Sequence, residues 1–262
     1  MAVYQLDDEL WFPDPHLGEE DGLVAVGGDL SVNRLLLAYS NGFFPWFSFR
    51  HWKEPHWYCP LDRYVIFPKE IHISHSMRQL MRQNKYIVTF NQCFDGVIRG
   101  CSSVDDRNQE YGAWLGSDMI KAYTELHRLG YAASVEVWEP QDMSSGKRSA
   151  KLVGGLYGVA VRNAFFGESM FSIVPNASKL ALIYLAKTLD GMGGLFIDCQ
   201  FETPHLKSMG GKHISYDKYM RILNGEEDVE LGSSVKTVGI KFSSSFLVVV
   251  ILAQKKNMGR DS

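Results

Sequence analysis

The sequence predicts an α+β fold, in which a buried helix covers a mostly antiparallel sheet. Two apolar runs, Leu152–Val161 and Ala164–Ser172, follow each other with only a short turn near Asn163, as antiparallel strands do. The segment Ala177–Leu189 is apolar nearly all round, which is typical of a buried helix, and Leu195–Phe201 then returns as a strand. The order is therefore strands, buried helix and strand.

Capping residues mark the predicted helices. Ser31 or Asn33 precedes one amphipathic run, Ser74 precedes a second, and Asn176 precedes the buried helix. Between the first two helices, we expect Arg63–Phe67 to form a strand.

Composition excludes several classes of protein. The chain has 262 residues, 45% of them hydrophobic and 22% charged, which is ordinary for a soluble globular protein and argues against disorder. The formal net charge of −3 excludes a globally basic nucleic-acid binder. Any contact with phosphates must therefore come from a local patch.

The four cysteines have no CxxC spacing and lie in apolar surroundings, so we expect reduced, mostly buried thiols and no metal site. The opening residues lack a basic segment followed by an apolar one, so we expect no secretory signal. Near the end, Phe246–Ala253 is strongly apolar but far shorter than the roughly 20 residues that span a bilayer. We read it as a strand and expect a cytoplasmic protein without a membrane anchor.

Cations recur along the helix that Ser74 precedes. Arg78, Arg82 and Lys85 are spaced i, i+4 and i+7, which would gather them into one stripe. Such a stripe is usually a solvated face. In an acidic protein it is also a reasonable docking surface for phosphates.

Aromatic residues crowd the segment Phe43–Phe47, which also contains Pro45, and Trp52, Trp57 and Tyr58 follow soon after. Aromatics at this density usually belong to the core. A loop interrupted by proline cannot bury them all on one helix face, so some are expected to line a groove. Both interpretations remain open at this point.

Two carboxylates, Glu168 and Asp198, stand inside strand-like apolar runs, where a charge is costly unless it is paired or used. Asp198 and Gln200 are two apart, so a strand would direct both side chains to one face. A carboxylate that orients an amide, whose oxygen accepts a hydrogen bond from an amine, suits aminolysis of an activated ester. Asp-x-Gln is also common in plain strands. Glu168 suits either a cationic substrate group or a buried salt bridge.

Six segments, taken together and in order between about Gly22 and Tyr219, resemble the bacterial leucyl/phenylalanyl-tRNA–protein transferases. Each motif is weak alone, but six in register are hard to obtain by chance. The segments are Gly27–Leu30, Gly42–Phe47, Gly154–Val159, Phe166–Ser172, Asn176–Lys179 and Ile197–Gln200.

The resemblance implies an enzyme that needs no cofactor. It would transfer Leu or Phe, and Met less well, from aminoacyl-tRNA to the α-amino group of proteins that begin with Arg or Lys. This reaction marks proteins for degradation in the N-degron (N-end rule) pathway. The implied fold is a small N-terminal α/β domain, residues 1–62, and a larger domain like that of the GNAT acetyltransferases, residues 63–230. Residues 231–262 form a tail unlike the family's ending, and we expect a monomer.

Site residues follow from the resemblance, position by position. Asp198 and Gln200 resemble the pair that handles the attacking amine, and Glu168 resembles the acid that helps to hold the substrates. The remaining positions match residues around the terminal adenosine and the aminoacyl group: Tyr39, Trp46, Trp114, Tyr123, Leu156, Phe165, Gly167 and Met170. Leu156 stands where the family often has Met, a change of similar volume.

Two other functions compete with this interpretation. An acetyl-CoA-dependent acetyltransferase would need a glycine-rich loop before the buried helix, but Ile173–Ser178 contains no glycine. A non-catalytic module that binds tRNA or peptides would keep the aromatic and basic residues without needing Asp198 and Gln200.

Overall fold

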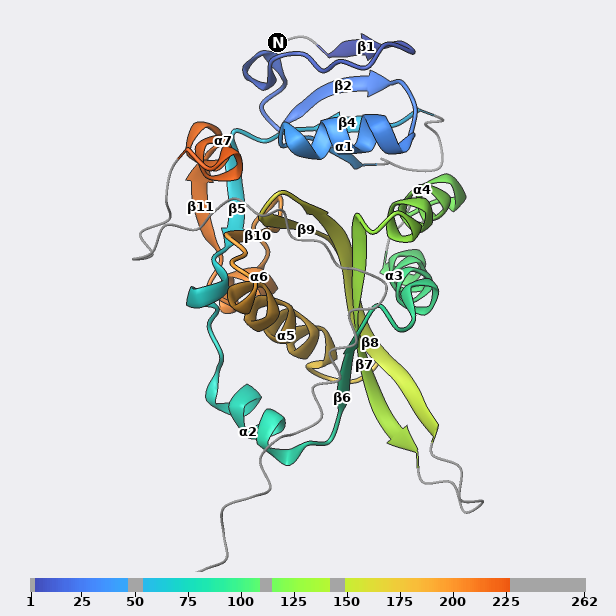
Figure 1. The fold of residues 1–262 in the computed structure, drawn as a ribbon, viewed down its shortest axis with the longest axis vertical. Coiled ribbons are helices and arrows are strands. Elements are labelled where there is room, and N and C mark those ends of the chain that lie inside the picture. Colours follow the sequence, from blue (N-terminus) through green and yellow to red (C-terminus); the bar gives the residue numbers. More distant parts are fainter. Residues whose placement is uncertain (1–2, 47–53, 109–114, 142–148, 227–262) are drawn as a thin grey trace, which may run out of the picture.

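The computed structural model describes residues 3–46, 54–108, 115–141 and 149–226, with only the backbone described for residues 104–108 (Figure 1). Within these ranges the chain forms two sheets and surrounding helices, and the smaller sheet lies at one end of the molecule. The α+β prediction is confirmed. Trp114 and the apolar run Phe246–Ala253 lie outside the described residues.

The smaller sheet has the strand order β1-β2-β4-β3, and only the β1–β2 pair is parallel. Helix α1 (Val32–Ser40) packs beside it, and the hydroxyl of Ser31 accepts a hydrogen bond from the Arg34 amide at 3.3 Å, as its capping position predicts. The strands are β1 (Tyr4–Leu6), β2 (Leu23–Gly27), β3 (Phe44–Trp46) and β4 (His56–Tyr58).

The larger sheet has the strand order β11-β5-β10-β9-β8-β7-β6. Its pairs are antiparallel except β9 with β10, because helix α5 (Ala177–Gly191) crosses over between these two strands. The strands are β5 (Asp62–Ile66), β6 (Ile87–Phe90), β7 (Ala132–Gln141), β8 (Ser149–Val161), β9 (Ala164–Ser172), β10 (Phe196–Asp198) and β11 (Lys212–Ser215).

Helices cover both faces of the larger sheet. In Figure 1, α3 (Phe94–Asn108) and α4 (Ser117–Arg128) lie on one side and α5 lies on the other. Strand β8 alternates between these layers: Tyr157 and Val159 belong to the core beneath α3 and α4, whereas Leu156 and Ala160 belong to the core beneath α5. The other described helices are α2 (His75–Gln83), α6 (Pro204–Ser208) and α7 (Tyr216–Asn224).

A glycine allows α5 to approach the sheet closely. A Cβ atom at Gly154 would lie 2.5 Å from the Cβ of Ala177, in the first turn of α5. This explains why position 154 is glycine where a plain core strand would carry Val or Ile.

The two sheets share one hydrophobic core. Tyr39 on α1 packs edge-on against Phe166 on β9, with ring centroids 4.9 Å apart, and both side chains are fully buried. Helix α1, which packs beside the small sheet, is therefore in direct contact with β9, the strand that carries Glu168.

The residue predicted to cap the buried helix stands at the N-cap position, but its side chain does not cap the helix. Asn176 is the N-cap residue of α5, but it adopts a left-handed conformation and its side chain makes no capping hydrogen bond. The Ser178 amide donates instead to the hydroxyl of Ser172 at the end of β9. In the described part of the chain, no helix is both long and apolar enough to cross a membrane.

Candidate active site

A cavity of about 620 Å³ lies between the end of β9, helices α5 and α6, and β3 of the small sheet. Its wall is largely apolar, with a few polar groups, as is typical of a small-molecule site. Six residues predicted from the sequence line it: Trp46, Leu156, Gly167, Glu168, Met170 and Gln200.

Further residues line the cavity that sequence reasoning missed. Ser178, Leu182 and Leu185 share one face of α5 with the spacing i, i+4 and i+7. This periodicity was available in the sequence, but the helix is apolar nearly all round, so no face stood out. Ile197, Cys199, Phe201 and His205 also line the cavity.

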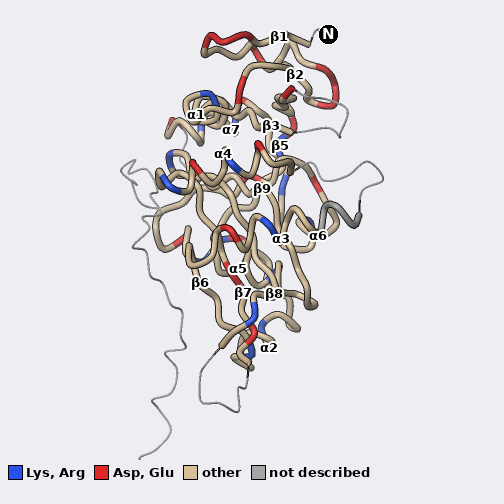
Figure 2. The backbone as a smooth tube through the Cα atoms, turned by 90° about the vertical axis from the view of Figure 1, so that its right-hand side faces the viewer, with Lys and Arg blue, Asp and Glu red and all other residues tan. Residues whose placement is uncertain are grey.

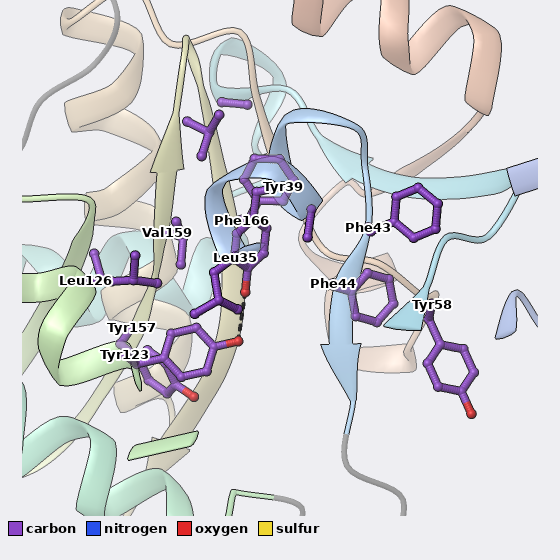
Figure 3. Close-up of a cluster of buried hydrophobic side chains, with 14 of the residues drawn as sticks. Leu35, Tyr39, Phe43, Phe44, Tyr58, Tyr123, Leu126, Tyr157, Val159 and Phe166 are labelled. Atoms are coloured by element: carbon purple, nitrogen blue, oxygen red, sulfur yellow. Dashed lines mark hydrogen bonds between the residues drawn. The ribbon is translucent and has the colours of Figure 1, made fainter. Parts of the chain in front are cut away.

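Glu168 is held by two tyrosines from different helices. The hydroxyl of Tyr39 on α1 donates to Glu168 Oε1 at 2.8 Å, and the hydroxyl of Tyr123 on α4 donates to Oε2 at 2.7 Å. The two hydroxyl oxygens are themselves 2.7 Å apart, as the dashed line in Figure 3 marks. Among the residues that the structure describes, Glu168 is therefore bound by two tyrosines and not by the Arg or Lys that the sequence left open.

Glu168 has a perturbed protonation equilibrium. Burial is the main cause, and it raises the pKa of this carboxyl to about 7, although the hydrogen bonds from Tyr123 and Tyr39 act in the opposite direction. The group therefore exchanges its proton near neutral pH, which suits acid–base chemistry.

Tyr39 and Tyr123 are fully buried, and neither lines the cavity. The resemblance assigned them to the surroundings of the adenosine and aminoacyl groups. In this structure both hydroxyls contact Glu168, which lines the cavity. Phe165 is also fully buried and lies behind the wall, in the core beneath α5. The burial of these three side chains results from close packing of aromatic rings from separate elements. The spacing of residues along the chain does not reveal such packing.

Asp198 is fully buried, and both of its carboxylate oxygens accept hydrogen bonds. Arg63 on β5 donates to both carboxylate oxygens, with Nη2 to Oδ2 at 2.6 Å and Nε to Oδ1 at 3.0 Å, and Arg63 is fully buried too. The Tyr219 hydroxyl on α7 donates to Oδ2 at 2.9 Å. Burial acts to lower the pKa of Arg63, but the adjacent carboxylate raises it overall, so the guanidinium stays charged.

Gln200 occupies a tight turn that Asp198 stabilises. The Gln200 amide donates to Asp198 Oδ1 at 2.9 Å, and Gln200 has a φ of +59°, in the left-handed region. The Gln200 carbonyl accepts a hydrogen bond from the Tyr64 amide on β5. Asp198 is therefore linked to the cavity by its hydrogen bond to the Gln200 backbone; Gln200 lines the cavity, and Asp198 does not.

The predicted strand Leu195–Phe201 is too long. Strand β10 ends at Asp198, because the turn at Gln200 stops the pairing with β9. The expectation that strand alternation directs Asp198 and Gln200 to one face is wrong for this reason. They are linked by a side-chain to backbone hydrogen bond instead.

The aromatic segment is divided between core and cavity. Phe43 and Phe44 are buried, whereas Trp46 is 39% exposed at the cavity edge. Trp46 packs against Tyr58 and Phe201, with centroid distances of 5.4 Å in both cases. Both interpretations left open by the sequence, core and groove, thus hold for part of the segment. Residues Phe44–Trp46 form strand β3.

The predicted basic stripe is shorter than its spacing suggests. Helix α2 ends at Gln83, and Asn84 turns the chain with a φ of +55°, so Lys85 leaves the helical face. The Lys85 ammonium lies 3.1 Å from the Glu139 carboxylate. Arg78 and Arg82 remain exposed on α2, at the end of the molecule opposite the small sheet in Figure 1. Figure 2 shows Lys and Arg positions spread along the molecule.

Family models match most of the chain. The model described as leucyl/phenylalanyl-tRNA protein transferase matches residues 65–224, and the model of that family's N-terminal domain matches residues 28–61.

Curated relatives with the same description match this chain over most of their own length. A leucyl/phenylalanyl-tRNA–protein transferase of Syntrophobacter fumaroxidans is 47% identical over 224 residues, which cover 85% of this chain and 90% of the relative. One of Flavobacterium psychrophilum is 44% identical over 221 residues, covering 84% and 99%. Among solved structures, L-PGS from Bacillus licheniformis is similar with a TM-score of 0.36 and 11% identity, over 71% of this chain and 57% of that one.

Proposed function

The chain belongs to the leucyl/phenylalanyl-tRNA–protein transferase family, an aminoacyltransferase family, and on this premise we propose a specific reaction for it. It transfers Leu or Phe, and Met less well, from aminoacyl-tRNA to the α-amino group of proteins that begin with Arg or Lys. The product is then recognised for degradation in the N-degron (N-end rule) pathway. The observation that carries this proposal is the apolar cavity, with Glu168 and Gln200 together in its wall.

The apolar wall suits the side chain of the transferred amino acid. Leu156, Met170, Leu182, Leu185 and Ile197 surround a volume that accepts a branched or aromatic side chain by size and hydrophobicity. Such a wall discriminates by only ~1–3 kcal/mol per methylene. Preference among Leu, Phe and Met is therefore graded.

The polar groups of the wall suit the amine that attacks the ester. The side chain of Gln200 can accept a hydrogen bond from the amine, while Asp198, itself held by Arg63, fixes the Gln200 backbone. Glu168 offers a carboxylate to a cationic group of the substrate. Trp46, at the edge, offers a partly exposed ring to the terminal adenosine, because rings of this kind stack on bases.

A transfer assay tests the reaction directly. With labelled Leu on tRNA, we expect the label to move to peptides that begin with Arg or Lys and not to one that begins with Ala. Equal transfer to all three peptides would contradict the proposed acceptor specificity. Free tRNA charged with a small polar amino acid is the matched donor control, because the apolar wall offers that side chain little burial.

We also propose that Arg78 and Arg82 contact tRNA phosphates, since both side chains are exposed on α2. Replacing both with Ala should weaken tRNA binding and flatten its salt dependence by roughly 0.7–0.9 in log–log slope per lost phosphate contact. Binding titrations between low and moderate salt measure this slope. Lys85→Ala is the matched control, because Glu139 already neutralises this ammonium. An unchanged slope in the double variant would mean that the phosphates bind elsewhere.

The remaining expectations are part of the same proposal. The protein acts as a monomer, without a cofactor, in the cytoplasm, where charged tRNA is available. Its domains are residues 1–62 and 63–230, with a tail at 231–262. The separate family models at 28–61 and 65–224 support a boundary near residue 62.

A further inference from the structure

Aminolysis of an ester needs a group that removes a proton from the attacking nitrogen. An α-amino group has an ordinary pKa of about 7.7–8.0, so at neutral pH it arrives largely as an ammonium ion with no free electron pair. The side-chain amide of Gln200 is not a base at this pH. The Asp198 carboxylate is bound by Arg63 and Tyr219, and it does not line the cavity.

Three titratable side chains line the cavity in the described part of the chain: Glu168, Cys199 and His205. Burial raises the pKa of the Cys199 thiol well above its ordinary value, so it keeps its proton. Glu168 is the one carboxylate among the described lining residues. His205 is the rival base, since its Nε2 atom is buried without a hydrogen-bond partner among the described residues.

The two protonation states of Glu168 differ in the number of hydrogen atoms available for its contacts with Tyr39 and Tyr123. The oxygens of Glu168, Tyr39 and Tyr123 form a triangle with three contacts of 2.7–2.8 Å. Three hydrogen bonds need three hydrogens, and the two tyrosines supply only two. With an ionised carboxylate one contact lacks a hydrogen, whereas a protonated carboxyl completes a closed ring of three hydrogen bonds.

We propose that Glu168 is the general base of the transfer reaction, and that Tyr39 and Tyr123 are positioning residues which hold its carboxylate ready to accept the proton of the amine. This inference rests on the proposed function. The two tyrosines come from α1, which packs beside the small sheet, and from α4, which covers the larger sheet.

The reaction removes two protons from the nitrogen and exchanges a C–O bond for a C–N bond. One N–H bond of the ammonium breaks, and the proton passes to the Glu168 carboxylate. The freed electron pair forms a C–N bond to the ester carbonyl carbon, and the ester C–O bond breaks. The ribose oxygen that leaves takes a second proton from the nitrogen, and the third hydrogen stays on the new amide. Glu168 returns its proton to solvent after the products leave.

The surroundings of Glu168 decide the pH at which this base is active. Besides Tyr39 and Tyr123, Asp198 on β10 raises the pKa of Glu168 and Arg63 on β5 lowers it. With a pKa of about 7, the carboxylate is ionised above neutral pH and protonated below it. The turnover rate should therefore fall as pH decreases through about 7, because the protonated form cannot accept a proton.

The first test is Glu168→Gln, whose amide still offers hydrogen-bonding groups to both tyrosines. We expect turnover at saturating substrates to fall by about 100-fold or more, since general bases contribute 10²–10⁴-fold, and the enzyme's contribution to the acid limb of the pH profile to disappear. Thermal unfolding and tRNA binding, measured alongside, should stay close to those of the unchanged protein. A rate and a pH profile like those of the unchanged protein would overturn the assignment.

Tyr39→Phe and Tyr123→Phe provide a second, independent readout. Each removes a hydrogen bond that lowers the pKa of Glu168, so the acid limb should move to higher pH. The peptide is the same in every assay, so its own amine cannot cause this movement. A purely structural role for the tyrosines would change the rate and leave the midpoint in place, and that result would overturn their part in the proposal.

The variant His205→Gln tests whether Glu168 or His205 is the base. We expect it to retain the acid limb that Glu168→Gln removes. Loss of the limb in the His205 variant alone would assign the base to His205 instead. If the unchanged protein transfers nothing to any peptide, the proposed function itself fails. If it transfers normally and Glu168→Gln does too, only the assignment of the base fails.

Discussion

Replacing Arg63 with Met is expected to lower the free energy of unfolding by about 3–5 kcal/mol. The change leaves Asp198 fully buried without a countercharge among the described residues, where the Tyr219 hydroxyl and the Gln200 amide are its remaining donors. It also removes a guanidinium that lies 4.9 Å from the centroids of both Phe44 and Tyr219. Urea denaturation followed by fluorescence measures the loss.

A matched control is Arg128→Met, which breaks an Arg–carboxylate pair of similar geometry on the surface of α4. Arg128 donates to Glu125 at 2.7 and 2.8 Å, but both side chains are exposed, so water replaces the lost partner and little change in stability is expected. If the two variants lose equal stability, burial of the Arg63–Asp198 pair has no energetic consequence.

The double variant Arg63→Met with Asp198→Leu separates stability from activity. It removes both charges, so most of the lost stability should return. Transfer should not return, because the Gln200 amide has lost the carboxylate that stabilises its left-handed turn. Recovery of transfer along with stability would mean that Gln200 keeps its position without Asp198.

Gly158→Ala is expected to destabilise the protein by about 3 kcal/mol, the upper range for overpacking. A Cβ atom at this position would lie 2.1 Å from the carbonyl oxygen of Phe166 and 2.5 Å from the ring of Phe165. A backbone oxygen cannot move aside as the end of a flexible side chain can, so strands β8 and β9 must separate. The pairing register between them already shifts beside Gly158.

Gly191→Ala, at the end of α5, is the control for this substitution. Nothing lies within 4 Å of a Cβ atom placed there, and alanine restricts the unfolded chain more than glycine does, so we expect equal or slightly higher stability. Differential scanning calorimetry of both variants compares them. Equal melting temperatures would contradict the steric account of Gly158.

Local signals predicted the three capped helices and the strands β5, β8 and β9 well. Ser31 and Ser74 both accept hydrogen bonds at the N-termini they were predicted to cap, because a cap depends only on residues three positions apart. Predictions that needed the exact end of an element were less accurate. Lys85 left the α2 face and β10 ended before Gln200, because in each case one residue adopts a left-handed conformation that sequence periodicity does not reveal.

The sequence by itself determined the α+β class, the family and six of the residues that line the cavity, since these depend on composition, periodicity and ordered motifs. Only the tertiary structure decided what the two carboxylates do. Arg63 donates to Asp198, which lies 135 positions away in the sequence, and Tyr39 donates to Glu168, which lies 129 positions away. A buried charge is stabilised by whichever groups the fold brings beside it, so its partner, and hence its role, depends on packing between distant segments.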